Sequence, residues 1–202
     1  MTHIATYIDI SPDSTAEAIA LLTEYRGATT SEEGNAGVIV LRETSRQNRF
    51  VVVGAWNTDT AFQTHEAAPH TVEFRSRLRA IHNSPYDQRA HHTFAAGSDQ
   101  AEKIDSLLYV VTHVDVPPPR KDETEVLLTV EAAKSRTDDG NVHYDVFQQN
   151  APRTNHFTVL AVWKNQAEFI SHQATPHTRQ FREALGPMLG APYDERLYGL
   201  LT

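Results

Sequence analysis

Apolar and polar positions follow one another in the same order twice along the chain. Residues 3–10 and 107–116 are rich in Ile, Val, Leu, Tyr and Thr and end at prolines, which is typical of strands. Apolar positions with helical spacing come next, so each strand is expected to lead into an amphipathic helix. These positions are Ala18, Leu21, Leu22 and Tyr25 in the first copy and Val126, Leu127 and Val130 in the second.

The second part of each copy predicts a hairpin and a broken helix. Gly34-Asn35 and Gly140-Asn141 supply turn chemistry. A helical region, roughly 59–82 and 165–189, is interrupted by Pro69 and Pro176, and proline suits a first helical turn, so two consecutive helices are expected there. Thr175 is a candidate N-cap, whereas Ala68 lacks a capping side chain. The apolar runs of the hairpins are 37–43 with 49–56 and 142–148 with 156–163, and a last short strand follows each Tyr-Asp pair.

The two copies are an internal duplication. Residues 50–94 align with 157–201 without a gap at a constant shift of 107, and 16 of these 45 positions are identical, including Trp, His and Pro. Upstream the alignment continues with a shift of 106 through Thr6/Thr112, Leu22/Leu128 and Gly34/Gly140. Chance similarity of amphipathic segments does not produce ungapped identity in such rare residues.

The element order in each copy is βαββαβ, which is the ferredoxin-like pattern. Phe50, Val52, Gly54 and Trp56 share one face of a strand, yet the opposite face is also apolar and needs a cover. The predicted fold class is therefore α+β: two tandem ferredoxin-like repeats, 1–97 and 105–202, with antiparallel sheets packed face to face as an intrachain dimeric α+β barrel. The small, polar linker is expected at Ala95–Gln100.

Composition and charge exclude several classes of function. The 202 residues include no Cys, so no disulfide, thiolate nucleophile, zinc thiolate or iron–sulfur site is expected. A formal charge of −8 argues against a nucleic-acid or anionic-membrane partner. No signal peptide, membrane span or phosphate-binding glycine motif is found, so we expect a cytoplasmic protein without a nucleotide cofactor.

The most specific element of the repeat is a Trp followed nine positions later by His and then by x-x-[AT]-Pro-His. With this motif the chain resembles the antibiotic biosynthesis monooxygenase superfamily, particularly its small quinol monooxygenases. The resemblance covers nearly the whole chain and implies an oxidoreductase with a small aromatic substrate and O₂ as partners and no cofactor. The motif occurs as Trp56, His65, Pro69 and His70 and as Trp163, His172, Pro176 and His177.

Each copy could hold an aromatic pocket with one titratable base. His172 and His65 are the candidate catalytic residues, because an imidazole suits proton transfer from a phenol near neutral pH. The candidate substrate-binding residues are Trp163, Trp56, Phe169, Phe62, Tyr144, His177 and His70. Tyr86, Tyr193, Arg89 and Arg196 are further candidates for stabilising an oxyanion. The substrate would be a small quinol or a polycyclic phenol.

Structural alternatives stay open for these residues. The two tryptophans could be core packing, His65 and His172 could be buried and hydrogen-bonded, and His70 and His177 could support a helix start. Arg89 and Arg196 could be ion-paired on the surface, and the Tyr-Asp pairs could only begin the last strands. Two other functions also remain: a non-catalytic barrel that binds an apolar small molecule, and a haem-degrading monooxygenase. Whether whole chains form homo-oligomers is left open.

No metal site is expected, because the spacing of five between His65 and His70, with a proline between them, does not give the i, i+4 face of two helical ligands. Haem is disfavoured because the haem-degrading branch has an Asn in the first strand, where this chain has Thr6 and Thr112. Some polyketide-tailoring relatives carry an Asn where this chain has Val52 and Val159.

Overall fold

A computed structural model describes residues 1–96 and 107–202, which form two compact units. Unit 1 comprises Met1–His91 and Gly199–Thr202, and unit 2 comprises His92–Tyr198. The last four residues therefore belong to the unit of the first repeat. Most of the linker expected at Ala95–Gln100 lies outside the described residues, and the repeat boundaries 1–97 and 105–202 stay predictions.

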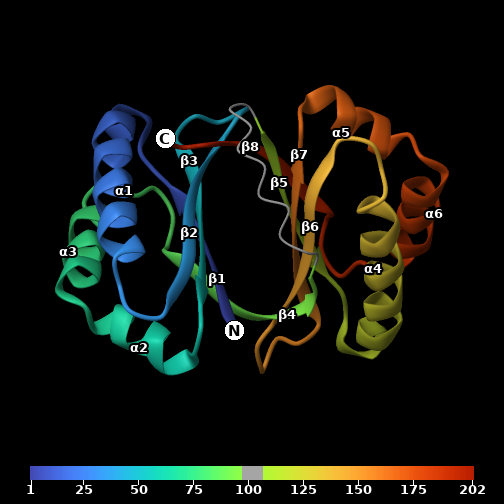
Figure 1. Ribbon diagram of the computed structural model, residues 1–202, viewed down its shortest axis with the longest axis horizontal. Helices are drawn as coiled ribbons and strands as arrows, with labels where there is room; N and C mark the ends of the chain where they lie inside the picture. Colours follow the sequence, from blue (N-terminus) through green and yellow to red (C-terminus); the bar gives the residue numbers. More distant parts are fainter. Residues whose placement is uncertain (97–106) are drawn as a thin grey trace. The chain divides into compact units, whose positions relative to one another are not determined.

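Unit 1 is a four-stranded antiparallel sheet with its helices on one face (Figure 1). Strand β3 is central, pairing with β1 on one side and β2 on the other, and β4 lies beside β1. Strand β4 ends in unit 2. The elements are β1 (Thr2–Asp9), η1 (Pro12–Ser14), α1 (Thr15–Thr30), β2 (Asn35–Glu43), β3 (Arg49–Trp56), α2 (Asp59–Ala67), α3 (Pro69–Leu78) and β4 (Asp87–Ala95).

Unit 2 repeats this arrangement, with β7 between β5 and β6 and with β8 beside β5 (Figure 1). The α+β class and the two ferredoxin-like repeats are thus confirmed. No helix among the described residues is long and apolar enough to span a membrane. The elements are β5 (Leu108–Asp115), η2 (Pro118–Arg120), α4 (Lys121–Ser135), β6 (Asn141–Gln149), β7 (His156–Trp163), α5 (Gln166–Gln173), α6 (Pro176–Leu185), η3 (Gly186–Met188) and β8 (Asp194–Leu200).

Local sequence explains the turns and breaks that position the pockets. Gly34 and Gly140 adopt φ values of +81° and +78°, the left-handed region that glycine enters without cost. As predicted, the helical region of each repeat is divided in two, with α3 beginning at Pro69 and α6 beginning at Pro176. The Thr175 hydroxyl accepts a hydrogen bond from the Thr178 amide and caps α6, while the N-cap residue of α3, Ala68, makes no side-chain cap hydrogen bond.

The core of each unit lies between its sheet and its helices. Phe50, Val52 and their counterparts Phe157 and Val159 belong to these cores, so the strand face that they share is the one that faces the helices. Residues on the opposite face are buried as well. Among them are Val51, Thr158, Leu160 and Val162. The sheets are therefore covered on both faces, as the apolar pattern requires.

The predicted buried face of helix α4 is wrong in part. Val126 and Val130 are exposed, whereas Leu128, Glu131 and Ala132 are buried. Hydrophobic periodicity missed this face because one of its buried members is a carboxylate, and Glu131 is stabilised there by hydrogen bonds from Thr178 and His177.

Candidate functional site

Each unit contains a small cavity between its sheet and its helices, lined by equivalent residues. Trp56, Phe62 and His65 line the cavity of unit 1. Trp163, Phe169 and His172 line that of unit 2. The structure therefore brings together, in each unit, the three residue types that the sequence predicted at a pocket. The two tryptophans are also buried in the cores, so each one both packs in the core and lines a cavity.

In unit 2, His172 is held by one ring nitrogen and leaves the other without a close partner. Its Nδ1 lies 2.7 Å from Asp138 Oδ2, and the side chain is 6% exposed. A carboxylate at Nδ1 takes the N–H and leaves Nε2 with its lone pair. The Thr178 hydroxyl oxygen lies 3.5 Å from Nε2, and that hydroxyl already donates to Glu131 at 2.8 Å. Nε2 is therefore available to accept a proton.

Two buried hydrogen-bond donors lining the same cavity have no partner among the described residues. They are the indole Nε1 of Trp163 and the guanidinium Nε of Arg182. The ring of Trp163 lies 4.5 Å from that of His172, centroid to centroid. Buried donors without a partner are rare in folded proteins and costly, which marks them as candidates for binding a ligand oxygen.

In unit 1, both ring nitrogens of His65 are occupied. Nδ1 lies 2.6 Å from Glu32 Oε2, and Nε2 lies 2.8 Å from the Tyr25 hydroxyl. Burial lowers the pKa of His65 against the opposing effect of Glu32, so the imidazole is favoured as the neutral form. Burial also raises the pKa of Tyr25, which keeps its hydroxyl protonated as the donor to His65.

A small set of substitutions accounts for this difference between the cavities. At the shift of 106, Tyr25 of α1 corresponds to Glu131 of α4, so unit 2 has no phenol that could reach His172 from that position. Tyr144 lines the cavity from β6, where unit 1 has Val38. Tyr144 was predicted at the pocket from sequence, and it lies there, fully buried, with its pKa raised by that burial.

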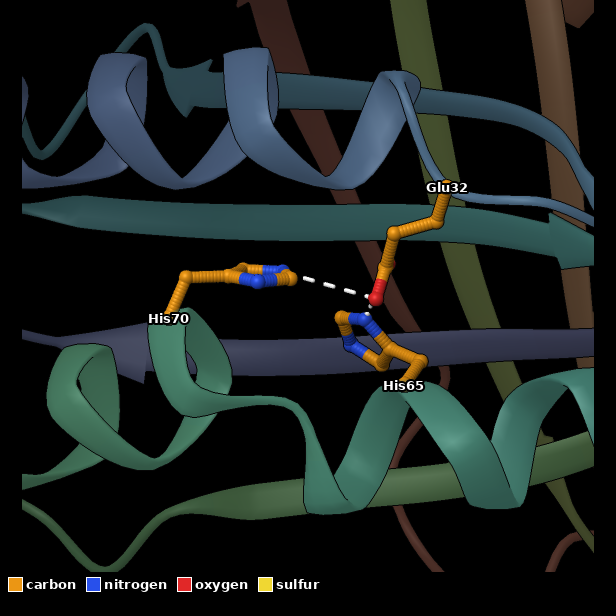
Figure 2. A group of neighbouring side chains, drawn as sticks. All are labelled: Glu32, His65 and His70. Atoms are coloured by element: carbon orange, nitrogen blue, oxygen red, sulfur yellow. Dashed lines mark hydrogen bonds and ion pairs between the residues drawn. The ribbon is translucent and has the colours of Figure 1, made fainter.

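His70 and His177 do not line these two cavities. His70 lies with His65 near Glu32, and His177 lies with His172 near Asp138. The substrate-wall role predicted for them is therefore not supported by their position. In unit 1, His65 at the end of α2 and His70 at the start of α3 converge on Glu32, which follows α1 (Figure 2). The two histidines do not share one helical face, but the break at Pro69 brings their rings to 5.7 Å from two separate helices, a convergence that the spacing alone did not predict.

In unit 2, His177 bridges two carboxylates. Its Nδ1 lies 3.0 Å from Glu131 Oε2, and its Nε2 lies 3.0 Å from Asp138 Oδ1. Burial lowers the pKa of His177, but the hydrogen bonds to Glu131 and Asp138 outweigh it and raise the pKa above its ordinary value. Donation from both nitrogens requires the imidazolium, so His177 neutralises part of this acidic cluster.

The other candidates fall into structural roles or at the rim of the cavity. Arg89 and Arg196 are ion-paired with Asp87 and Asp194, as the structural alternative held. Tyr193 lines the unit 2 cavity, and the guanidinium of Arg182 lies 5.5 Å from the centre of its ring. Tyr86 packs against the core of unit 1 and has the same relation to Arg75.

Sequence reasoning missed Glu32, Asp138, Glu131 and Arg182. The acids lie in a helix or in the loop after it, far along the chain from the histidines that they contact, so no local motif joins them. Arg182 is identical to Arg75 at the shift of 107, but this identity alone does not indicate a hydrogen-bond donor in the cavity.

Both cavities are small as they stand. The free space is about 10 Å³ in unit 2 and about 20 Å³ in unit 1, which is roughly the room that one water molecule needs. Thr6 and Thr112 line these cavities, as do Val52 and Val159. A ligand ring must displace part of the wall, and a haem would have to displace far more of it.

The chain belongs to the antibiotic biosynthesis monooxygenase family, whose model matches residues 1–77 and 107–184. The protein described as "Putative monooxygenase YcnE" of Bacillus subtilis (strain 168) is 27% identical over 88 residues, which is 44% of this chain and 92% of that protein. This relative thus corresponds to about one repeat. The class defined by fold and sequence is that of monooxygenases built from two copies of this domain.

Solved structures of similar proteins extend the likeness to the whole chain. A "Putative monooxygenase" of Fusobacterium nucleatum is 15% identical with a TM-score of 0.86, covering 100% of this chain and 92% of that one. An "anthrone oxidase-like protein" is 12% identical with a TM-score of 0.79, covering 98% and 90%. At these identities the likeness establishes a shared fold.

Proposed function

We propose that unit 2 catalyses the monooxygenation of a small quinol by O₂, without a bound cofactor. The observation that carries this proposal is the composition of its cavity: a histidine with an open Nε2 and two unpartnered donors, Trp163 Nε1 and Arg182 Nε. A base next to donors of this kind is what a phenol needs in order to become a phenolate. Membership of a monooxygenase family supplies the class of reaction.

The chemistry begins with proton transfer. His172 Nε2 accepts the phenolic proton, and Asp138 stabilises the resulting imidazolium through Nδ1. The Trp163 and Arg182 donors stabilise the phenolate oxygen as it forms, because both donor atoms are buried and no water competes for their hydrogen bonds. The electron-rich anion can then reduce O₂, which a neutral phenol does far less readily.

The overall reaction balances with O₂ as the only oxidant. A quinol gives up four electrons in total: one oxygen atom is bonded to a ring carbon, the other leaves as water, and the product is a hydroxyquinone. The two hydrogens that appear in water are those lost by the quinol. His172 therefore returns to its neutral form at the end of each turnover.

The size of the cavity narrows the substrate class. Free space of about 10 Å³ has to be enlarged even for one ring, and each additional ring requires more displaced side chains. We therefore favour a single-ring quinol over the polycyclic phenols that the sequence left open. The apolar wall formed by Val110, Val159, Phe169 and Phe181 suits the hydrocarbon part of such a ring.

Oxygen uptake with a panel of one-ring and polycyclic quinols tests this function. The expected result is uptake above the rate of autoxidation for one-ring quinols, with one atom of ¹⁸O₂ in the organic product and the other in water. Uptake at the rate of autoxidation for every quinol, or a product without ¹⁸O, contradicts the proposal. In that case, tight displacement of a hydrophobic dye by the same quinols would indicate the non-catalytic binding function instead.

A further inference from the structure

Unit 1 contains a second cluster of chemical groups that the proposed oxidation does not use. Glu32, His65 and His70 each offer one ligand atom, and these atoms lie within 4.8 Å of one another (Figure 2). We propose that these three side chains bind a divalent transition-metal ion of the zinc type, and that the equivalent residues of unit 2 do not. Two imidazoles and a carboxylate are a common ligand set for Zn²⁺.

The distances suit a shared ion. Zinc bonds of about 2.0–2.2 Å to nitrogen and oxygen place neighbouring ligand atoms of a tetrahedral site about 3.3 Å apart. Glu32 Oε1 lies 3.6 Å from His70 Nε2, the other carboxylate oxygen, Oε2, lies 2.6 Å from His65 Nδ1, and one ligand atom from each of the three residues lies within 4.8 Å of the other two. Both separations are within about 1 Å of those required, and rotation of the Glu32 side chain can adjust them.

His70 supplies an independent sign of a missing ligand. Its Nε2 is inaccessible to solvent and has no hydrogen-bond partner among the described residues. The separation of 3.6 Å from Glu32 is too long for a hydrogen bond. A buried polar atom without a partner is costly, and a cation between this nitrogen and the carboxylate would satisfy both.

The surroundings of His65 favour ligation through Nδ1. Histidine ligands usually donate their other N–H to a neighbouring oxygen, which fixes the ring. An ion bound at Nδ1 displaces the proton from that nitrogen, so the ring proton moves to Nε2 and the Tyr25 oxygen, 2.8 Å away, changes from donor to acceptor. The side chains of His70 and Glu32 are 28% and 19% exposed, and His70 lines a groove of about 60 Å³ beside α1, so the cluster lies close to solvent although His70 Nε2 itself is covered.

Unit 2 has the same ligand types, two histidines and a carboxylate, but their hydrogen-bond partners differ from those in unit 1. Glu131 replaces Tyr25, and His177 is hydrogen-bonded to carboxylates through both ring nitrogens. The positive imidazolium thus lies where a metal ion would compete for Asp138. No side-chain nitrogen of this cluster is orphaned as His70 Nε2 is, so unit 2 gains less from a bound cation.

Zinc binding to the metal-free full chain tests the inference without any turnover. The chain has two tryptophans, one beside each histidine cluster, so labelling with 5-fluorotryptophan gives one ¹⁹F signal per unit. The expected result is one Zn²⁺ per chain by equilibrium dialysis, with a shift of the Trp56 signal and none of the Trp163 signal. Single Trp→Phe variants assign the two signals.

Paired variants locate the ion. Glu32→Gln and His70→Gln are each expected to weaken Zn²⁺ binding at least about tenfold. The matched Asp138→Asn and His177→Gln are expected to leave it within about twofold, because they lie in the other unit. Since His70 is partly exposed, His70→Gln serves if Glu32→Gln fails to fold. No binding at micromolar Zn²⁺, binding that survives both unit 1 variants, or a second ion held by Asp138 and His177 overturns the proposal.

Discussion

The two units share a fold and a Trp–Phe–His cavity, yet the histidine is presented differently in each. In unit 2, Nε2 of His172 is open beside unpartnered donors. In unit 1, Nε2 of His65 is capped by the Tyr25 hydroxyl at 2.8 Å. A single exchange of residue type, Tyr25 for Glu131, accounts for most of this contrast. Duplication within one chain thus allows one half to keep an available base while the other half is free to adopt another role.

The largest expected effect is a difference in oxygen uptake between variants of His172 and variants of His65. His172→Asn should lower quinol-dependent oxygen uptake by about 10²–10⁴-fold, because it removes the proton acceptor. The matched His65→Asn should retain the wild-type rate within a few-fold. Initial rates in an oxygen electrode, corrected for autoxidation, provide the measurement. Equal losses in both variants would show that the units do not differ in the way described.

The next effect is a loss of kcat when the carboxylate of Asp138, which contacts His172 Nδ1, is removed. Asp138→Asn should lower kcat about 10–100-fold with a smaller change in KM, since it no longer orients His172 and stabilises its cation. Asp138→Glu should restore much of the rate, because unit 1 holds His65 with a glutamate at the same position. If Asp138→Asn and Asp138→Glu lose kcat equally, Asp138 supports structure and not proton transfer.

A smaller effect is expected in stability, and it again differs between the units. Thr178→Val should lower the free energy of unfolding by about 1–3 kcal/mol, because the buried Glu131 loses a donor at 2.8 Å. Thr71→Val at the equivalent position should cost less than about 1 kcal/mol, since its closest contact in the cluster is His65 at 3.3 Å. Urea unfolding of both variants measures the difference, and equal costs would contradict the distinct role of Glu131.

The smallest effect is a pH dependence that arises from His177. Its pKa is raised in the folded chain, so its contribution to stability is complete below about pH 6.5, the ordinary value, and is lost as the pH rises through the raised value. The stability difference between wild type and His177→Gln should therefore be larger at acidic than at alkaline pH. Urea unfolding across this range measures it. A difference that grows with pH would reverse the sign and contradict the assignment.

Much of the fold could be read from the sequence, because the duplication tests each element twice. The apolar runs of β3 and β7 predicted the strands, and the prolines at Pro69 and Pro176 predicted the helix breaks. The face of α4 could not be found, because Glu131 is buried by partners distant in the sequence. Periodicity assumes that buried positions are apolar, and a paired carboxylate violates that assumption.

The candidate site was predictable only in its aromatic rings, most of which recur in both repeats. Trp163, Phe169, His172 and Tyr144 line the cavity as expected. Asp138 and Arg182 became visible only when the fold placed them beside the histidine and the indole. The hydrogen-bond partners of the two histidines could not be predicted from the sequence. His65 and His172 occupy the same motif and differ only in their contacts with residues elsewhere in the chain.

The difference between the two cavities is tested most directly by an anaerobic quinol titration of the chain labelled with 5-fluorotryptophan. Trp163 and Trp56 are the only tryptophans in the sequence, so each ¹⁹F signal reports one cavity. We expect a one-ring quinol to shift the Trp163 signal in a saturable manner and to leave the Trp56 signal unchanged. A saturable shift of the Trp56 signal at the same quinol concentrations, or no shift of the Trp163 signal, would contradict it.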